Sequence, residues 1–142
     1  MNATAARSGR AATVALGILL ASTHVASAPK RPPSGKAIAR VWRGRTLQSK
    51  ADAYQAYLNQ AGISKIRATP GNLGVYVLRR TENDQAEFVV LSLWESIAAI
   101  QKFAGADYQK AVILPRDREY LLEVAPNVLH YEVVRSEVAP AG

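Results

Sequence analysis

Residues Ala86 to Ser96, A-E-F-V-V-L-S-L-W-E-S, form the segment around which the rest of the chain is organised. Its centre, from Phe88 to Leu93, is almost continuously apolar, which is typical of a strand buried on both faces. Ser96 is a good cap for the helix that the spacing of the following apolar residues predicts. A central strand therefore runs directly into a helix, and Trp94 stands at the junction. We expect this junction to lie near the ligand.

Outward from this strand, the chain alternates between strand-like and helix-like segments. Residues 37–45 predict a first strand, and a helix follows from Ser49 to about Gln60, where Gly62 is expected to end it. After a connection over 63–70, the other predicted elements are a strand at 73–80, a polar hairpin loop at 81–85, the central strand, a helix at 97–104 that Gly105 breaks, a helical piece at 107–114, one or two turns at 116–123 and a last strand at 128–135.

The resulting order, β-α-β-β-α-β, is that of the ferredoxin-like α+β arrangement, an antiparallel sheet with helices on one face. We expect the strand order 4-1-3-2, with strands one and three parallel to each other and strands two and four antiparallel to them. One end of the sheet would then bring Trp42 and Trp94 close to His130, with Arg40 and Tyr76 one step further in.

This convergence has a functional and a structural interpretation. In the functional one it forms a pocket for a flat aromatic or quinone-like ligand, in which tryptophan faces stack on the ligand. His130 would then move a proton, and Arg40 or Arg43 would hold an oxyanion. In the structural one, the tryptophans anchor the core or a subunit interface and His130 is a hydrogen-bonded structural residue. The alternating charges of residues 116–119 predict a solvated face.

The strands are apolar on both faces, which predicts a partner for the face that the helices leave open. Val75 and Val77 alternate with Tyr76 and Leu78 in the second strand, for example. A bare apolar sheet face would be a large exposed patch. We therefore expect a symmetric homodimer in which two sheets pack together.

The composition excludes several kinds of site. The chain has 142 residues, enough for one domain with a core, and 49% of them are hydrophobic. It has no cysteine and two histidines, so disulfides, thiolate catalysis and cysteine-bound metals are excluded and a multi-histidine metal site is not expected. Since the glycine spacing at 71–74 is not that of a nucleotide-binding loop, we expect no cofactor. The net charge of +7 comes from dispersed basic residues, so we expect no nucleic-acid partner.

The N-terminal residues read as a targeting segment. Residues 1–28 have a basic start, an uncharged apolar run and small residues before a proline, which is the layout of a secretory signal peptide. A start codon placed too far upstream, giving a non-native leader, is the alternative. The apolar run is too short for a stable membrane span. We expect an exported or periplasmic protein if the leader is genuine and a cytoplasmic one otherwise. Residues 29–36 are expected to be a linker, 37–135 the folded domain and 136–142 a tail.

Three motifs give the folded part a family resemblance. L-S-L-W-E-S at 91–96, A-I-Q-K-F-A-G at 99–105 and H-Y-E-V at 130–133, in this order of elements, resemble the antibiotic biosynthesis monooxygenase-like proteins. The resemblance covers residues 38–134 and implies a dimeric α+β barrel. It also implies one of several activities, because the family includes cofactor-independent monooxygenases of polycyclic phenols or quinols, haem-degrading enzymes and members of unknown role.

The resemblance carries over residue by residue only in part. Trp94 matches the tryptophan that ends the third strand in the phenol-oxidising branch, but Val90 and Ile100 stand where that branch has an asparagine and a tyrosine. The haem-degrading branch has an asparagine, a tryptophan and a histidine at the positions that this chain fills with Val41, Phe103 and one of Val112 and Ile113.

These observations lead to a first hypothesis of a homodimeric, cofactor-free monooxygenase acting on a small aromatic molecule. His130 would be the base, Arg40 or Arg43 would stabilise the anion, and Trp94 would be the stacking wall beside Trp42 and Tyr76. A second hypothesis is a non-catalytic, dimeric ligand-binding or stress-related module. A third is haem binding with His130 as the axial ligand.

Overall fold

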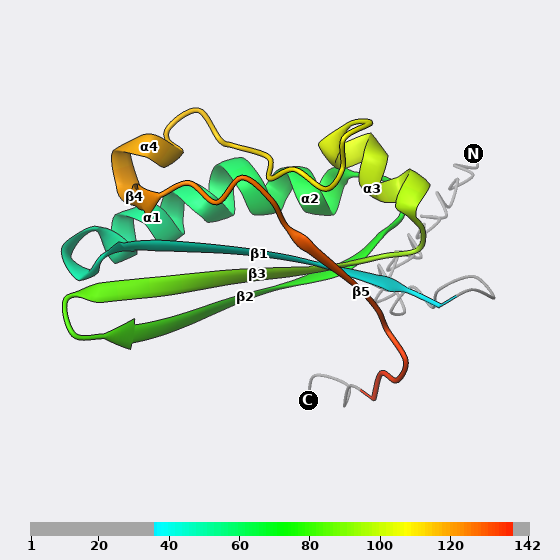
Figure 1. The fold of residues 1–142 in the computed structure, drawn as a ribbon, viewed down its shortest axis with the longest axis horizontal. Helices are drawn as coiled ribbons and strands as arrows, with labels where there is room; N and C mark the ends of the chain where they lie inside the picture. The colour runs from blue at the N-terminus through cyan, green and yellow to red at the C-terminus, as the bar shows by residue number, and fades with distance from the viewer. Residues whose placement is uncertain (1–35, 138–142) are drawn as a thin grey trace, which may run out of the picture.

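The computed structural model describes residues 36–137, which form one sheet with helices on one of its faces (Figure 1). The elements are β1 (Ile38–Leu47), η1 (Gln48–Lys50), α1 (Ala51–Tyr57), η2 (Leu58–Ile63), α2 (Ser64–Ala68), β2 (Asn72–Glu82), β3 (Gln85–Trp94), α3 (Ile97–Ala104), α4 (Asp117–Tyr120), β4 (Leu121–Glu123) and β5 (Leu129–Glu132). The strand order is β2-β3-β1-β4, and β5 also pairs with β1. This confirms the ferredoxin-like α+β fold, with β4 and β5 sharing the place of the fourth strand.

The predicted direction of the third strand was wrong. β1 and β3 are antiparallel, with Ile38 opposite Trp94 and Leu47 opposite Gln85. The reason is topological, because the helical crossover leaves β1 parallel to β2 and the β2–β3 hairpin then reverses the chain. Trp94, the last residue of β3, therefore lies opposite the first residue of β1, whereas Trp42 lies opposite Val90.

The hairpin and the first helix are both more regular than predicted. β2 and β3 continue to Glu82 and Gln85, so the connection is a two-residue turn in which Asn83 has φ 54°. The helical segment runs without a break from Ala51 to Ala68, with the π-helical η2 in its middle. Gly62 does not end it, because this glycine packs against Leu58 and Leu114 inside the fold. Tertiary packing thus overrides the helix-breaking tendency of a single glycine.

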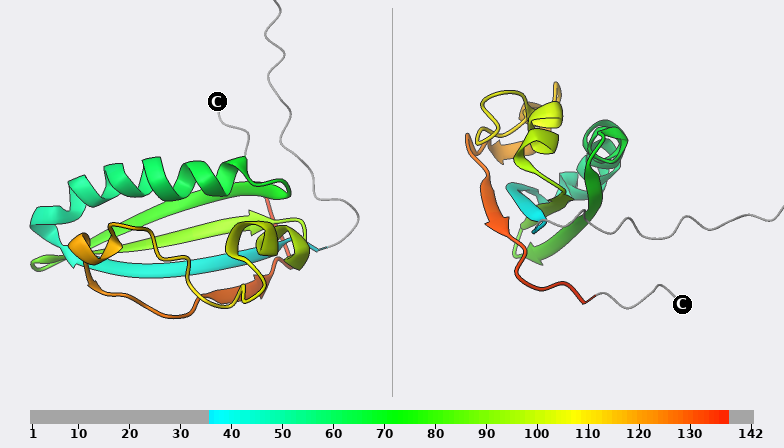
Figure 2. Two further views of the ribbon diagram at one scale, coloured as in Figure 1. Left: turned by 90° about the horizontal axis from the view of Figure 1, so that it is seen from above. Right: turned by 90° about the vertical axis from the view of Figure 1, so that its right-hand side faces the viewer.

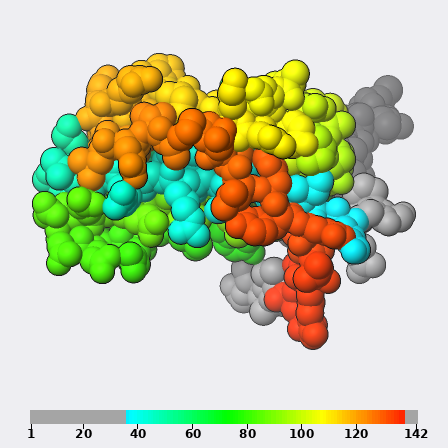
Figure 3. Space-filling view, viewed as in Figure 1, coloured from blue at the N-terminus to red at the C-terminus, as the bar shows by residue number. Residues whose placement is uncertain are grey.

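The helix after the central strand agrees with its prediction, but the next segment does not. The Ser96 side chain accepts a hydrogen bond of 3.1 Å from the amide of Ala99, and α3 ends before Gly105, which has φ 85°. Residues 107–114 form no helix. Their backbone bonds instead to the chain before β5, with Ala111 N–H donating to the Pro126 carbonyl at 2.9 Å and the Gln109 carbonyl accepting from Val128 N–H at 2.9 Å. Figure 3 shows the chain from α3 through β5, yellow to orange-red, covering the upper part of this side of the molecule.

All helices lie over one face of the sheet, which we call the inner face (Figure 2). The core forms between this face and the helices, and its largest fully buried side chains include Trp94, Tyr54 and Phe88. β3 is therefore buried on its inner face, while the residues of its outer face are only partly covered. The central strand was predicted to be buried on both faces. In a single copy of the chain, only its inner face is buried.

The terminal predictions lie largely outside the described residues. The predicted leader, residues 1–28, and residues 29–35 of the predicted linker are not among them, nor are residues 138–142 of the predicted tail. Within residues 36–137, no helix has the length and apolar character needed to cross a membrane.

A substitution of Gly71 tests whether the turn between α2 and β2 needs a glycine. It has φ +88°, and a Cβ atom there would lie 2.5 Å from the Cβ of Ala99. We expect Gly71→Ala to lower the free energy of unfolding by about 1–3 kcal/mol, through backbone strain and this clash. Gly74→Ala is the matched control, because no atom lies within 4 Å of the added Cβ and its φ is not positive. Urea unfolding measures both, and equal losses of stability would contradict the prediction.

Candidate functional site

Three polar side chains meet on the inner face at one level of the sheet. Arg40 of β1 is paired with Ser92 of β3 on one side and with His130 of β5 on the other. Side chains of paired residues lie on the same face of a sheet, so all three point toward the helices. The two-residue alternation of β1 puts Arg40 and Trp42 on this inner face and Arg43 on the outer face.

Arg40 is a buried cation that has no acidic partner in the part of the chain that the structure describes. Its side chain is 4% exposed, and it donates hydrogen bonds to the carbonyls of Tyr108 and Lys110, the latter at 2.8 Å. Within residues 36–137 no carboxylate oxygen lies within 4.0 Å of its guanidinium. Burial lowers the pKa of Arg40 to about 10, so the group stays charged at neutral pH. Its charge is solvated only by neutral dipoles.

His130 is held against this cation in its neutral form. Nε2 of His130 lies 3.2 Å from Nη1 of Arg40, and the ring of Tyr108 approaches the imidazole edge-on with centroids 5.2 Å apart. Burial and the charge of Arg40 both lower the pKa of His130. A nitrogen that faces a guanidinium must act as an acceptor, which assigns the ring proton to Nδ1.

Trp94 is closed off by its own contacts. It is fully buried, its Nε1 donates to Ser92 Oγ at 2.9 Å, and its ring stacks on Phe103 with centroids 5.7 Å apart. The guanidinium of Arg40 lies 5.9 Å from the centre of the other ring of this stack, Phe103. Trp94 therefore supports the residues around Arg40 and does not present a free face to a ligand.

A small cavity lies between the inner face and the helices. Arg40 and Trp42 line it together with Ser92, Tyr54 and Asp117, and the rest of its wall is apolar. Its volume is about 50 Å³, enough for a few water molecules and too small for a flat aromatic ring. Part of its wall is formed by Val112 and Leu114, which belong to the segment without regular structure between α3 and α4. An aromatic ligand therefore requires the wall to move outward.

The structure brings together only some of the residues expected at the site. Trp42 lines the cavity with Arg40, whereas His130 and Trp94 lie beside it and do not line it. Trp42 and Trp94 are not neighbours along β1, because the antiparallel register separates them by four residue positions. Trp94 was expected at the other end of β1 only because the two strands were taken as parallel.

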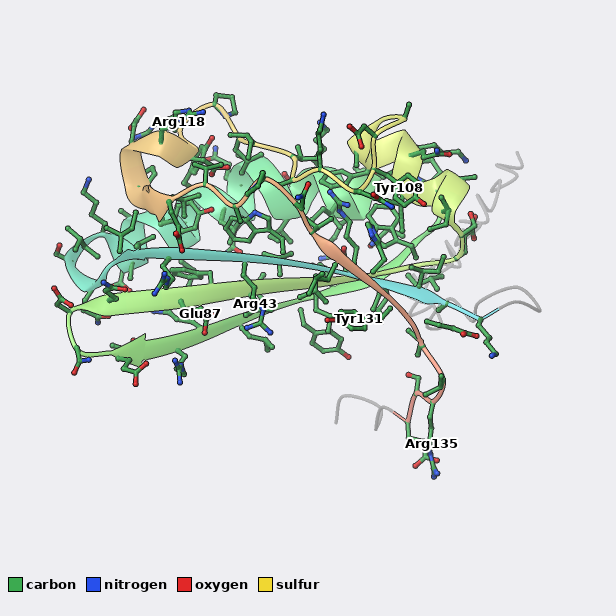
Figure 4. All side chains as sticks on the ribbon, viewed as in Figure 1. Arg43, Glu87, Tyr108, Arg118, Tyr131 and Arg135 are labelled. Carbon is green, nitrogen blue, oxygen red and sulfur yellow. The ribbon has the colours of Figure 1, made fainter. Side chains whose placement is uncertain are left out.

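Arg43 and Tyr76 lie on the outer face, away from the cavity. Arg43 is exposed and its Nη1 lies 3.5 Å from Glu87 Oε1, and Figure 4 shows both side chains pointing away from the helices. Tyr76 is paired with Leu91, also an outer-face residue. Successive residues of a strand point to opposite faces, so the register of β1 and β2 against β3 is enough to assign both residues to the outer face.

Sequence reasoning missed Asp117. It was expected on a solvated face, but its side chain is 2% exposed and lines the cavity. Its Oδ2 accepts from the amide of Leu114 at 2.7 Å, and its Oδ1 accepts from the hydroxyl of Tyr54 at 3.3 Å. Burial raises the pKa of Asp117, and the two hydrogen bonds partly oppose this shift. The available signal was Tyr54, because a tyrosine on a core stripe needs a partner for its hydroxyl.

The titration of His130 gives a test of this geometry. Its pKa is lowered in the folded state, so below pH 6.5 the unfolded chain binds a proton that the folded chain does not. The stability that the neutral His130 contributes is present above pH 6.5 and is lost as the pH falls toward the lowered pKa. We expect His130→Gln, which keeps an acceptor for Arg40, to lose less stability than the wild type between pH 8 and pH 5. Urea unfolding at both pH values measures this, and an unchanged loss would contradict it.

Comparison with known proteins identifies the family. The sequence model of the antibiotic biosynthesis monooxygenase family matches residues 44–114, and no curated protein matches the chain. A protein of unknown function from Nitrosomonas europaea is 19% identical, with a TM-score of 0.54 over 75% of this chain and 96% of its own. A proposed antibiotic biosynthesis monooxygenase from Bacillus cereus is 19% identical, with 0.51 over 74% and 100%.

A heme-degrading protein from Mycobacterium tuberculosis is 17% identical, with a TM-score of 0.50 over 72% of this chain and 99% of its own. These identities are low, so the three structures show the fold alone. Among residues 36–137 there is no group of three or more histidine, aspartate or glutamate side chains that could hold a metal ion. The family match covers half of the chain and includes the motifs at 91–96 and 99–105, and the chain therefore belongs to the antibiotic biosynthesis monooxygenase family.

Proposed function

We propose that this protein oxidises a small phenol or quinol with dioxygen, without a metal or an organic cofactor, and that Arg40 stabilises the substrate oxyanion. The observation that carries the proposal is the buried, uncompensated charge of Arg40 beside a cavity with mostly apolar walls. A buried cation that lacks an acidic partner gains most from an anion placed next to it. A phenolate supplies that charge, and its ring suits the apolar walls.

The reaction needs no reductant from outside. For 1,4-hydroquinone, one dioxygen gives one hydroxylated 1,4-benzoquinone and one water, so the substrate provides all four electrons. Deprotonation makes the ring electron-rich enough to react with dioxygen, and a cation next to the oxygen makes that deprotonation easier. The walls of the cavity exclude bulk water, which strengthens this electrostatic effect.

His130 supports this arrangement through Arg40. Its Nε2 faces the guanidinium, so the imidazole can take a proton from a substrate only after that contact opens. We therefore assign His130 the positioning of Arg40, and its role as the base stays a prediction. Haem binding through His130 would need the same contact to open, and the residue does not line the cavity.

Oxygen uptake with 1,4-hydroquinone tests the role of Arg40. We expect Arg40→Gln to lower kcat/KM by about 10²–10³-fold, the usual cost of losing one oxyanion-stabilising donor, and Arg40→Lys to lower it less because the charge remains. Arg45→Gln is the matched control, since Arg45 lies on the same strand but on the outer face, paired with Glu123 at 2.7 Å.

Circular dichroism and urea unfolding check that each variant is folded, since Arg40 also holds two backbone carbonyls. An active wild type whose rate is unchanged in Arg40→Gln would contradict the role of Arg40. A wild type that binds the hydroquinone without consuming oxygen would favour a non-catalytic binding module.

We also propose that two copies of the chain form a symmetric dimer through the outer face. Four large apolar side chains there are roughly half exposed, namely Tyr76, Leu78, Leu129 and Tyr131. They lie on β2 and β5, on either side of the partly covered apolar residues of β3. Figure 4 shows Tyr131 projecting from this face, away from the helices. A second copy has the same apolar outer face. In a dimer with two-fold symmetry, the two outer faces would pack against each other and be removed from water.

Light scattering after gel filtration tests the dimer. We expect Leu78→Glu to shift the wild-type dimer toward a monomer, because a two-fold axis buries the new carboxylate twice. Ile113→Glu is the control, since Ile113 has similar exposure but belongs to the segment on the helix side of the sheet. A monomeric wild type, or equal effects of the two substitutions, would contradict this interface.

A further inference from the structure

The cavity contains a second charged group, the carboxyl of Asp117, which the proposed role of Arg40 does not use. Like Arg40, it is almost completely buried, and among the described residues no nitrogen of a lysine, arginine or histidine lies within 4.0 Å of it. Its only hydrogen bonds are the two already described, and the bond from Tyr54 is long at 3.3 Å. A buried carboxylate with so little compensation has a strong tendency to take up a proton.

The neighbouring cations are engaged elsewhere. The guanidinium of Arg116 binds Glu119 at 2.8 Å and donates to the hydroxyl of Tyr120 at 2.9 Å. Lys50 donates to the backbone carbonyl of Glu119 at 2.7 Å. Among the described residues, the groups that contact Asp117 are the hydroxyl of Tyr54 from α1 and the amide of Leu114. The remaining cation of the cavity is Arg40.

Asp117 and Arg40 lie at different levels of the sheet. The hydroxyl of Tyr54 binds Asp117, and the Tyr54 ring packs edge-on against Phe88 with centroids 5.3 Å apart. Phe88 is paired with Gly44, four residues along β1 from Arg40. Four residues of a strand span roughly 13 Å. Arg40, Trp42 and Asp117 all line the cavity, so its wall carries a cation and a carboxyl at two different levels of β1.

The geometry points to Asp117 as the general base of the proposed oxidation, acting on a ring with hydroxyl groups at opposite ends, such as a 1,4-hydroquinone. With the wall moved outward, one hydroxyl of such a ring would give its proton to bulk water on binding and meet Arg40 as the phenolate, while the opposite hydroxyl would donate to Asp117. This inference deepens the proposed function and rests on it, because it names the base and the substrate class for the same cavity. It also gives a base to a site in which the histidine is already occupied by Arg40.

The proton-transfer step is simple. The O–H bond of the substrate hydroxyl breaks, its electron pair stays on the substrate oxygen, and the proton goes to a carboxylate oxygen of Asp117. Asp117 becomes neutral, which relieves the cost of its buried charge. The proton later leaves with the oxygen atom that is released as water. Burial raises the pKa of Asp117 toward the working pH, as efficient general-base catalysis requires.

The pH profile of kcat/KM separates this role from a structural one. The wild-type value should fall at low pH as Asp117 is protonated, because the base must be ionised. Asp117→Asn keeps an acceptor for Leu114 N–H, so we expect it to fold, to lose this acidic limb and to lower kcat/KM by about 10²–10⁴-fold. Tyr54→Phe removes a hydrogen bond that lowers the pKa of Asp117, so its limb should move to higher pH.

A matched control and a second measurement complete the test. Glu123→Gln changes an exposed acid on the neighbouring β4, paired with Arg45, and should keep the wild-type profile. In anaerobic samples with 1,4-hydroquinone, infrared difference spectra should show a protonated carboxyl band that is absent in Asp117→Asn and present in Glu123→Gln. Tryptophan fluorescence reports binding of the hydroquinone itself.

The outcomes distinguish this inference from the proposed function. An active wild type whose Asp117→Asn variant keeps both the acidic limb and the rate overturns the role of Asp117 and leaves the proposed function standing. A protein that consumes no oxygen but shows the carboxyl band overturns the oxidation and supports Asp117 as the proton acceptor. If hydroquinone does not bind, both are overturned. Loss of the limb and of the band in Asp117→Asn alone supports both.

Discussion

The buried guanidinium of Arg40 joins three segments that are far apart in the sequence. It extends from β1, meets His130 of β5, and binds the backbone carbonyls of Tyr108 and Lys110. The segment between α3 and α4 has no helix or strand of its own to satisfy these carbonyls. A charged donor satisfies them well, because hydrogen bonds to ionised groups are stronger than those between neutral groups. The same contacts bring residues 105–116 over the cavity.

These contacts of Arg40 explain why charged side chains line a cavity whose walls are otherwise apolar. The arginine is used to hold the wall, yet its charge has no acidic partner among the described residues, and Asp117 at another level of β1 has no cation. Two buried charges of opposite sign that do not meet are costly for stability. Such costs are common where a protein binds or transforms a ligand, and here a ligand with groups at both ends would compensate both charges.

The fold itself leaves the activity open. Structures with the same arrangement include a heme-degrading protein and a protein of unknown function, so the fold places a cavity under the helices without deciding its chemistry. In this chain the inner face carries the charges and the outer face carries half-exposed apolar side chains. The alternation of a strand thus gives the two faces of one sheet different characters, with the cavity on one face and an exposed apolar surface on the other.

The order of the elements, the family resemblance and the two faces of β1 can be read from the residues alone. Ser96 and Gly105 bound α3 through local backbone chemistry, and the two-residue period of a strand puts Arg40 and Trp42 on one face. Which residues stand opposite one another depends on the tertiary structure. The direction of β3 depends on the helical crossover from β1 to β2 and on the β2–β3 hairpin. Because β3 is antiparallel to β1, Trp94 lies away from Trp42. The burial of Asp117 depends on a tyrosine 63 positions earlier, and no local pattern encodes a contact over that distance.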